Sequence, residues 1–385
     1  MQSLKNKKEL REHLVMLTKE LIRFPSHVDE MQKNFDIIDF IKSYFDKDNL
    51  HIKQYIFGGF PSIVITSEET KHPNIFLSGH ADIIATGTNF TAEERDGKLF
   101  GTGAMDMKGG VACMMAVMKY FVSQKDMPSV GLMITTDEEV GGNNGTKALL
   151  SKEGYRCNFA IINEGRDEYD IVLLEKGRVD LKFIVRDQAA HSAYPWRTKN
   201  AAEVLMQFLL EVKKLFPKTN GDWSSVGTTT VLRAGTDNAP NVIPSKAEAL
   251  FTIRLTEEAR WTATEILERI SKLAPENLEI KVVRSEGAAR SDASHPYVQI
   301  LKQVAEDVTK KKMKFAENHG GSDARFFGEA RIPFAILGPA GYGHHSPDEY
   351  AHIDSYVTHF NVLKEFITTA PKTLQTPMEK LRKIS

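Results

Sequence analysis

Apolar positions in this chain of 385 residues alternate between helical and strand-like spacing. The leucines of residues 10–21 recur at the spacing of one helix face, and Pro25 ends this predicted helix. Helical patterns also cover residues 35–45, 111–121, 146–150, 296–311 and 355–368. Short apolar runs typical of strands cover residues 50–57, 61–66, 74–77, 130–135, 159–162 and 333–337. This alternation predicts an α/β fold with a mixed, mostly parallel sheet covered by helices.

The middle of the chain follows another order. Its expected elements are strand, helix, strand, strand, helix and strand, at residues 179–185, 201–216, 227–233, 247–255, 259–273 and 278–283. This βαββαβ order is typical of a ferredoxin-like domain. We therefore expect a catalytic domain in two parts, 1–178 and 291–385, with an inserted domain at 179–290. The polar and basic residues from 371 onward are expected to form a loosely held tail.

Composition and charge exclude several classes of protein. A chain of this length exceeds what one hydrophobic core usually supports, which agrees with two domains. The net charge of −1 does not favour nucleic acid or an anionic membrane as a partner. Cys113 and Cys157 form no CxxC motif. No apolar run is long enough to cross a bilayer. The first residues are charged and lack the apolar core of a signal peptide. A soluble cytoplasmic protein is expected.

Histidine and acidic side chains follow the ends of several predicted strands or lie in glycine-rich loops. In chain order, these residues are His80 and Asp82, Asp106, Glu138 and Glu139, Glu164, and the pair His344 and His345. The carboxyl ends of strands in an open α/β sheet meet at one edge, where ligands and catalytic groups collect. Histidine with carboxylate suits Zn²⁺, with Co²⁺ or Mn²⁺ as possible substitutes, and no cysteine lies near these motifs. The pattern therefore indicates a metal site centred on Asp106.

The same residues have other interpretations. Residues 101–106 nearly spell GxGxxG, but Asp106 replaces the third glycine and would repel a dinucleotide pyrophosphate. The acidic run at 137–139 has the alternative interpretation of a solvated turn. The zincin motif HExxH and the nucleophile motif GxSxG are both absent from the sequence. A nucleotide-binding protein and a catalytically silent, metal-stabilised binding protein stay open as alternatives, and metal analysis would separate them.

Taken together, the motifs resemble one known family. The order is HxD at 80–82, GTGAMDMKGG at 101–110, DEEVGG at 137–142, NEG at 163–165 and HSPDE at 345–349. This order resembles the dinuclear-zinc amidohydrolases and peptidases, a family that includes acetylornithine deacetylase, succinyl-diaminopimelate desuccinylase, aminoacylase and glutamate carboxypeptidase. The resemblance extends over residues 10–369. It implies a zinc-peptidase-like fold and two bound metal ions, and it makes the inserted domain a dimerisation domain.

The resemblance also implies roles for the clustered residues. Asp106 would be the carboxylate that bridges the two metal ions. His80 and Glu164 would complete the ligands of one ion, and Glu139 and His345 those of the other. His345 is preferred to His344 because family members place the ligand directly before a segment like SPDE.

Two further roles follow from the same resemblance. Glu138 would be the general base, and Asp82 would orient the His80 ring. The family also implies a cis peptide bond after the bridging aspartate, here between Asp106 and Met107.

Further matches lie outside the metal ligands. His191, in AHSAYP at 190–195, corresponds to a histidine that reaches the active site of the other subunit and stabilises the oxyanion. Asn241, in NVIP, corresponds to a substrate contact, and Tyr194 fits the desuccinylase subgroup. Arg254 and Arg325 correspond to arginines that hold a substrate carboxylate, a task that suits the planar guanidinium.

These matches predict a metal-dependent hydrolase that cleaves the amide bond of an N-acyl amino acid. The attacking group would be a water molecule bridged between two metal ions, and the enzyme would be a homodimer. In the family, glutamate at the position of Glu164 accompanies deacylases and glutamate-type carboxypeptidases. The segment GGSD at 320–323 lacks the threonine of the desuccinylase motif GGTSD. We therefore expect the acetylornithine deacetylase or succinyl-diaminopimelate desuccinylase type, with a glutamate-carboxypeptidase-like or dipeptidase-like enzyme on short peptides as the alternative.

Overall fold

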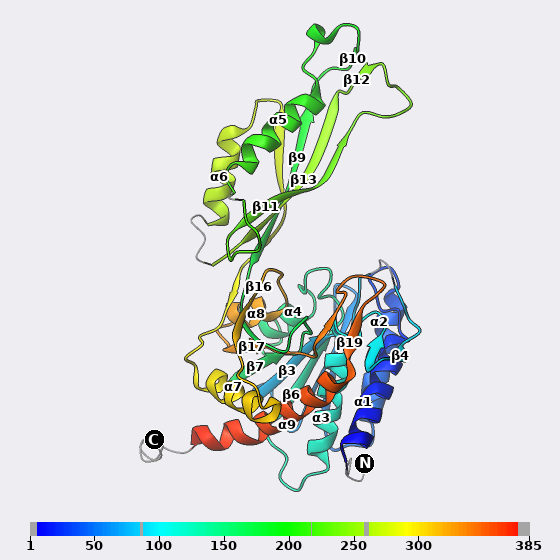
Figure 1. Ribbon diagram of the computed structural model, residues 1–385, viewed down its shortest axis with the longest axis vertical. Helices are drawn as coiled ribbons and strands as arrows, with labels where there is room; N and C mark the ends of the chain where they lie inside the picture. The colour runs from blue at the N-terminus through cyan, green and yellow to red at the C-terminus, as the bar shows by residue number, and fades with distance from the viewer. Residues whose placement is uncertain (1–5, 85–87, 217, 258–261, 376–385) are drawn as a thin grey trace. The chain divides into compact units, whose positions relative to one another are not determined.

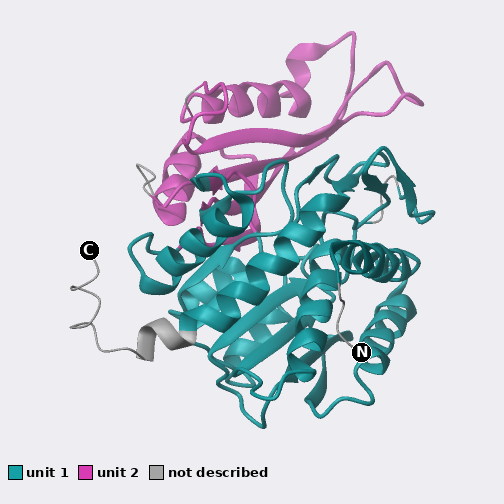
Figure 2. Ribbon diagram, turned by 60° about the horizontal axis from the view of Figure 1, so that its bottom comes forward, with its two compact units in different colours: residues 1–173, 291–316, 322–385 teal, residues 174–290, 317–321 magenta. Residues whose placement is uncertain are grey.

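The computed structural model describes residues 6–84, 88–216, 218–257 and 262–375. The chain forms two compact units, which are coloured separately in Figure 2. Unit 1 comprises residues 1–173, 291–316 and 322–385, and unit 2 comprises residues 174–290 and 317–321. Strand β16 (Phe315–Asn318) pairs with β8 (Ile171–Glu175). The short segment 317–321 belongs to unit 2, where the backbone oxygen of Asn318 accepts a hydrogen bond from the N–H of Lys176, at 3.3 Å.

Most of the main sheet lies in unit 1, and its strand order is β1-β2-β6-β3-β7-β17-β8-β15, of which β15 and the last two residues of β8 belong to unit 2. Its remaining strands are β1 (His51–Phe57), β2 (Phe60–Thr66), β3 (Ile75–His80), β6 (Val130–Thr135), β7 (Phe159–Ile162), β15 (Ala289–Arg290) and β17 (Phe334–Ile336). The central strands β6, β3, β7 and β17 run parallel, and the outer pairs are antiparallel. The predicted α/β class is therefore confirmed, with the parallel pairing in the centre of the sheet.

Helices pack on this sheet and on one another through buried apolar residues. Figure 1 labels these helices. They are α1 (Lys7–Ile22), α2 (Met31–Tyr44), α3 (Lys108–Val122), α4 (Thr146–Ser151), α7 (Pro296–Thr309), α8 (Ala324–Glu329) and α9 (Ile353–Gln375). The Asn6 side chain caps α1 by accepting a hydrogen bond from the backbone N–H of Glu9, at 3.0 Å. The face that the leucine spacing predicted, including Leu14 and Leu21, is fully buried.

The ends of the chain and the shortest strands differ from the prediction. Helix α9 continues to Gln375, so the first residues of the predicted tail, 371–375, are helical. The remainder of that tail lies outside the described residues. A small sheet with the order β18-β19-β5-β4 was not predicted, because its strands are too short to show a period. These strands are β4 (Glu93–Arg95), β5 (Lys98–Phe100), β18 (Gly341–Tyr342) and β19 (Tyr350–His352).

Unit 2 has the predicted βαββαβ order. Its elements are β9 (Gly177–Arg186), α5 (Ala201–Lys213), β11 (Val226–Ala234), β13 (Lys246–Leu255), α6 (Ala263–Leu273) and β14 (Leu278–Glu286). The strands form an antiparallel sheet in the order β11-β13-β9-β14, and α5 and α6 cover it around a separate core. The start predicted for the second helix, residues 259–261, lies outside the described residues. Between β9 and β13, the short strands β10 (Ala190–His191) and β12 (Val242–Ile243) pair, and a 3₁₀ turn covers Pro195–Arg197.

Candidate active site

Parallel pairing brings the ends of three strands to one edge of the main sheet. His80 is the last residue of β3 and lies opposite Thr135, the last residue of β6. On the other side of β3, Ser78 lies opposite Ile162, the last residue of β7. The segments after β6 and β7, which carry Glu138, Glu139 and Glu164, therefore begin at the edge where His80 lies.

Asp106 lies in the loop between β5 and α3, and its two carboxylate oxygens face different imidazole rings. Its Oδ1 is 3.2 Å from Nε2 of His80. Its Oδ2 is 3.3 Å from Nε2 of His345 and 2.5 Å from Nε2 of His344. The Asp106 carboxylate is buried, and the peptide bond to Met107 is cis, as the family resemblance implied.

A second carboxylate holds the His80 ring from the opposite side. Nδ1 of His80 is 3.0 Å from the backbone oxygen of Asp82 and 3.4 Å from its Oδ1. Asp82 Oδ2 accepts a hydrogen bond from the backbone N–H of Glu139, at 3.0 Å, and so ties β3 to the acidic segment after β6. Burial alone would lower the pKa of His80, but the Asp106 and Asp82 carboxylates raise it well above its usual value. The carboxylates around the His80 ring therefore stabilise positive charge at this position in the site.

The adjacent acids Glu138 and Glu139 have different neighbours. Glu139 Oε2 is 3.2 Å from Nε2 of His345, whereas Glu138 Oε2 is 4.0 Å from Nε2 of His80. Burial raises the pKa of Glu138 well above its usual value, although the nearby His80 opposes the shift. Burial also raises the pKa of Glu139, and its hydrogen bond with His345 opposes that shift.

Both histidines of the C-terminal loop reach Asp106. His345 has a left-handed backbone (φ 56°), and the two rings meet edge to face with centroids 4.1 Å apart. The two are equally exposed, at 45% for His344 and 46% for His345, so burial does not distinguish them. Nε2 of His345 also lies 3.2 Å from Oε2 of Glu139. The sequence pattern assigned no role to His344, although two adjacent histidines in a glycine-rich loop indicated that both could reach the site.

The donor set suits metal ions. Among the described residues, Asp106, His344 and His345 each offer a ligand atom, and these atoms lie within 4.8 Å of one another. Carboxylate oxygens facing imidazole nitrogens are the mixture that Zn²⁺ and similar divalent ions accept. Asp106 presents one oxygen to His80 and the other to His345, and this donor set would hold divalent metal ions.

Arg325 lies in the interior of unit 1. Its guanidinium is buried and donates to the backbone oxygens of Ser322 and Gly141, at 2.7 and 2.9 Å. Gly141 follows the Glu138-Glu139 pair by two residues, so Arg325 holds the segment that carries these acids.

Unit 2 contains the remaining predicted site residues. Pairing of β10 with β12 places Nε2 of His191 3.5 Å from Nδ2 of Asn241. The rings of His191 and Tyr194 are 6.0 Å apart between centroids. Arg254 lies on β13, half-buried. His191, Asn241 and Tyr194 thus form one group at the β10–β12 pair, and Arg254 lies near the end of β13.

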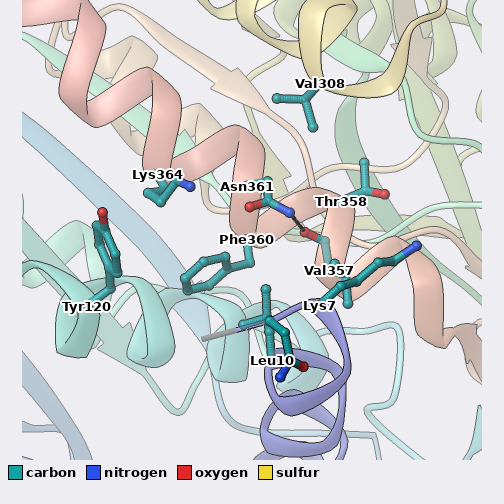
Figure 3. Close-up of a pocket in the computed structure, with 10 residues that line it drawn as sticks. Lys7, Leu10, Tyr120, Val308, Val357, Thr358, Phe360, Asn361 and Lys364 are labelled. Carbon is teal, nitrogen blue, oxygen red and sulfur yellow. Dashed lines mark hydrogen bonds between the residues drawn. The ribbon is translucent and has the colours of Figure 1, made fainter. Parts of the chain in front are cut away.

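The hollow drawn in Figure 3 is a different feature of unit 1. It has a volume of about 440 Å³ and is lined from α1, α3, α7 and α9, with Leu10, Tyr120 and Phe360 among its residues. None of its lining residues belongs to the group around Asp106.

Comparisons with known proteins find relatives in sequence and in fold. The chain is 28% identical over 386 residues to succinyl-diaminopimelate desuccinylase of Rickettsia rickettsii, covering 91% of this chain and 98% of that protein. Its fold resembles the M20 family metallo-carboxypeptidase Sso-CP2 of Sulfolobus solfataricus (TM-score 0.79, 16% identity, 93% of this chain and 99% of that one). It also resembles YXEP of Bacillus subtilis, a dinuclear metal-binding peptidase of the M20 family (TM-score 0.69, 15% identity, 95% and 99% covered).

The family assignment rests on a match to a model of the family as a whole. Residues 76–369 match the peptidase family M20/M25/M40, and this segment holds every residue of the Asp106 group. The metal-binding donor set and the convergence of strand ends are in accord with that match. This chain is therefore a member of the M20/M25/M40 family of metal-dependent hydrolases.

Proposed function

We propose that this protein hydrolyses the amide bond of an N-acyl amino acid and is of the acetylornithine deacetylase or succinyl-diaminopimelate desuccinylase type. The observation that carries the proposal is the arrangement around Asp106, whose two oxygens face His80 and His345 while Glu138 lies beside them. The desuccinylase of Rickettsia rickettsii, similar along nearly its whole length, supports this substrate class.

The residues divide the chemistry among them. Asp106, His80 and Glu164 would hold one divalent ion, and Asp106, Glu139 and His345 the other. When bound, the two ions supply Lewis-acid activation of a water molecule. Zn²⁺ is our first choice, and Co²⁺ or Mn²⁺ could replace it.

Glu138 is the proposed general base. Its carboxylate would accept a proton from the attacking water and deliver it to the leaving amine. Its Oε2 lies 4.0 Å from Nε2 of His80, farther than the Asp106 and Glu139 carboxylates lie from their nearest imidazole nitrogens, which suits a group that moves protons without holding an ion. Asp82 would keep the His80 ring in one orientation through Nδ1, at 3.0 Å to its backbone oxygen.

Four residues of unit 2 are the proposed substrate contacts. Arg254 would pair with the free carboxylate of the amino acid, and Asn241 and Tyr194 would contact the rest of the substrate. His191 would donate to the developing oxyanion. Arg325 was expected to bind a carboxylate as well. Because its guanidinium donates to Ser322 and Gly141, we propose that it acts on substrate through the Glu138 segment.

A second candidate is a carboxypeptidase or dipeptidase that acts on short peptides. The metallo-carboxypeptidase Sso-CP2 shares this fold, which favours keeping that candidate. The two enzymes need the same metal site and differ in the group on the acyl side of the bond that is cut.

A hydrolysis screen tests the proposal. Zinc-loaded protein is incubated with acetyl-, succinyl- and formyl-amino acids and with dipeptides, each with and without a chelator. We expect chelator-sensitive release of amine from one of the acyl-amino acids. Chelator-sensitive cleavage of dipeptides alone would favour the second candidate, and a protein that binds no metal and cleaves nothing would contradict both.

We propose further that the active protein is a cytoplasmic homodimer joined through unit 2. In unit 2, β11 is an edge strand of the antiparallel sheet, and Leu232 on it is 51% exposed. On α5, Leu210 is 66% and Met206 46% exposed. An open edge beside exposed apolar residues is commonly covered by a second copy across a two-fold axis. Within the residues described, no helix has the length and apolar character to cross a bilayer.

Mixing two inactive variants tests the dimer and the role of His191. A His191→Ala chain and a Glu138→Gln chain should each be nearly inactive. After subunit exchange, a mixed dimer would have one site with both an intact Glu138 and a partner's intact His191. Equal mixing should therefore restore about one quarter of wild-type activity, because half of the dimers are mixed and one of their two sites is complete. No recovery after proven exchange, or a monomer by light scattering, would contradict this arrangement.

A further inference from the structure

The loop that carries Asp106 is held by one buried carboxylate from a distant part of the chain. Glu349 Oε1 accepts hydrogen bonds from the backbone N–H groups of Met105 and Asp106, at 2.8 and 3.0 Å. Its Oε2 accepts from the N–H of Gly103, at 2.9 Å. Glu349 is 2% exposed, so these bonds are shielded from water. Backbone N–H groups in such a turn have no ladder partner, and each one buried without an acceptor is costly.

Glu349 also joins this loop to the segment that carries His345. It follows His345 by four residues and directly precedes β19, whose Tyr350 pairs with Phe100 of β5. Its backbone oxygen accepts from the N–H of Gly101, at 3.0 Å. Glu349 therefore contacts the Asp106 loop at both the start and the end of that loop. Glu349 itself belongs to the chain segment that carries His345.

We propose that Glu349 is a positioning residue that sets the direction of the Asp106 carboxylate and thereby the affinity of both metal ions. Its bond to the N–H of Asp106 fixes the backbone from which the bridging carboxylate projects. A rotation of that backbone would move Oδ1 relative to His80 and Oδ2 relative to His345 at the same time. The inference rests on the metal roles proposed above for these three residues.

Substitution by glutamine removes part of the contact with little change of shape. An amide oxygen can replace Oε1 and accept from Met105 and Asp106, but the amide nitrogen would then face the N–H of Gly103, where a donor meets a donor. Reversal of the amide leaves the other two N–H groups without an acceptor. Either orientation loosens the loop without touching a ligand side chain.

A matched control lies elsewhere in unit 1. Glu306 lies on helix α7, and its Oε1 accepts a hydrogen bond from the backbone N–H of Met313, at 3.0 Å. Glu306→Gln therefore removes a carboxylate that binds backbone N–H, as Glu349→Gln does, but far along the chain from the Asp106 loop.

The test measures Zn²⁺ affinity of the folded proteins by competition with a chromophoric chelator, together with thermal unfolding. In Glu349→Gln we expect both ions to bind about 10- to 100-fold more weakly, the usual range for loss of a group that supports metal ligands. Glu306→Gln should bind both ions as the wild type does, even if it unfolds at a lower temperature.

The outcomes separate this proposal from the one on which it rests. If wild-type protein binds two ions and Glu349→Gln binds both equally well, or is weakened for one ion alone, the positioning role is overturned. If Glu306→Gln weakens metal binding to the same extent, the effect is one of general stability and the role is likewise overturned. A wild type that binds no metal would instead overturn the proposed function.

Discussion

Replacing Glu138 by glutamine is expected to lower kcat by about 10²- to 10⁴-fold, the usual contribution of a general acid–base residue. Metal content and KM should stay close to those of the wild type. The reason is that Glu138 would move protons without holding an ion, and its Oε2 lies 4.0 Å from the nearest His80 nitrogen. Glutamine keeps the size of the side chain and removes the proton acceptor. Steady-state kinetics with metal analysis of the same preparation measure both effects.

The adjacent Glu139 provides the matched control. Its Oε2 is 3.2 Å from Nε2 of His345, so Glu139→Gln should release or weaken one metal ion as well as lower turnover. The pair of variants thus separates a proton carrier from a ligand at neighbouring positions in the chain. Near-normal turnover in Glu138→Gln, or metal loss equal to that of Glu139→Gln, would reject the role of base.

Much of this site could be predicted because its residues follow fully buried strands. All residues of β3 and β6 are buried, so each strand includes a short run of apolar residues that can be recognised in the sequence. His80 and the Glu138-Glu139 pair come directly at or after those ends. Parallel pairing then brings them to one edge, which a reader of the sequence can anticipate from the alternation of strands and helices.

Contacts that depend on tertiary packing could not be predicted in the same way. Glu349 lies 243 residues along the chain from Asp106, and β19, which brings it there, is too short to show a period. Its sequence signal was only the acid at the end of HSPDE. Arg325 shows the converse case, because a motif match indicated a substrate contact while packing buries the guanidinium against Gly141. Neither a buried acceptor nor a buried donor can be distinguished from an exposed one by residue type alone.

Removal of the Asp106 carboxylate is expected to have the largest effect on metal binding. Asp106→Ala should lose both ions, because each oxygen of this carboxylate faces a different imidazole, His80 through Oδ1 and His345 through Oδ2. His345→Ala should weaken mainly one ion, since His345 contacts Asp106 and Glu139 but has no predicted part in the site of His80. Equilibrium dialysis against Zn²⁺, with the metal per chain measured in each variant, gives both results.

His344 provides the decisive control for this prediction. Nε2 of His344 is 2.5 Å from Asp106 Oδ2, whereas Nε2 of His345 is 3.3 Å away. Distance to Asp106 alone would therefore select His344 as the ligand. Contact with Glu139 selects His345, and His344→Ala should therefore keep both ions. If His344→Ala loses an ion and His345→Ala keeps it, the ligand is one residue earlier than predicted. If Asp106→Ala folds and retains two tightly bound ions, Asp106 is not the bridge.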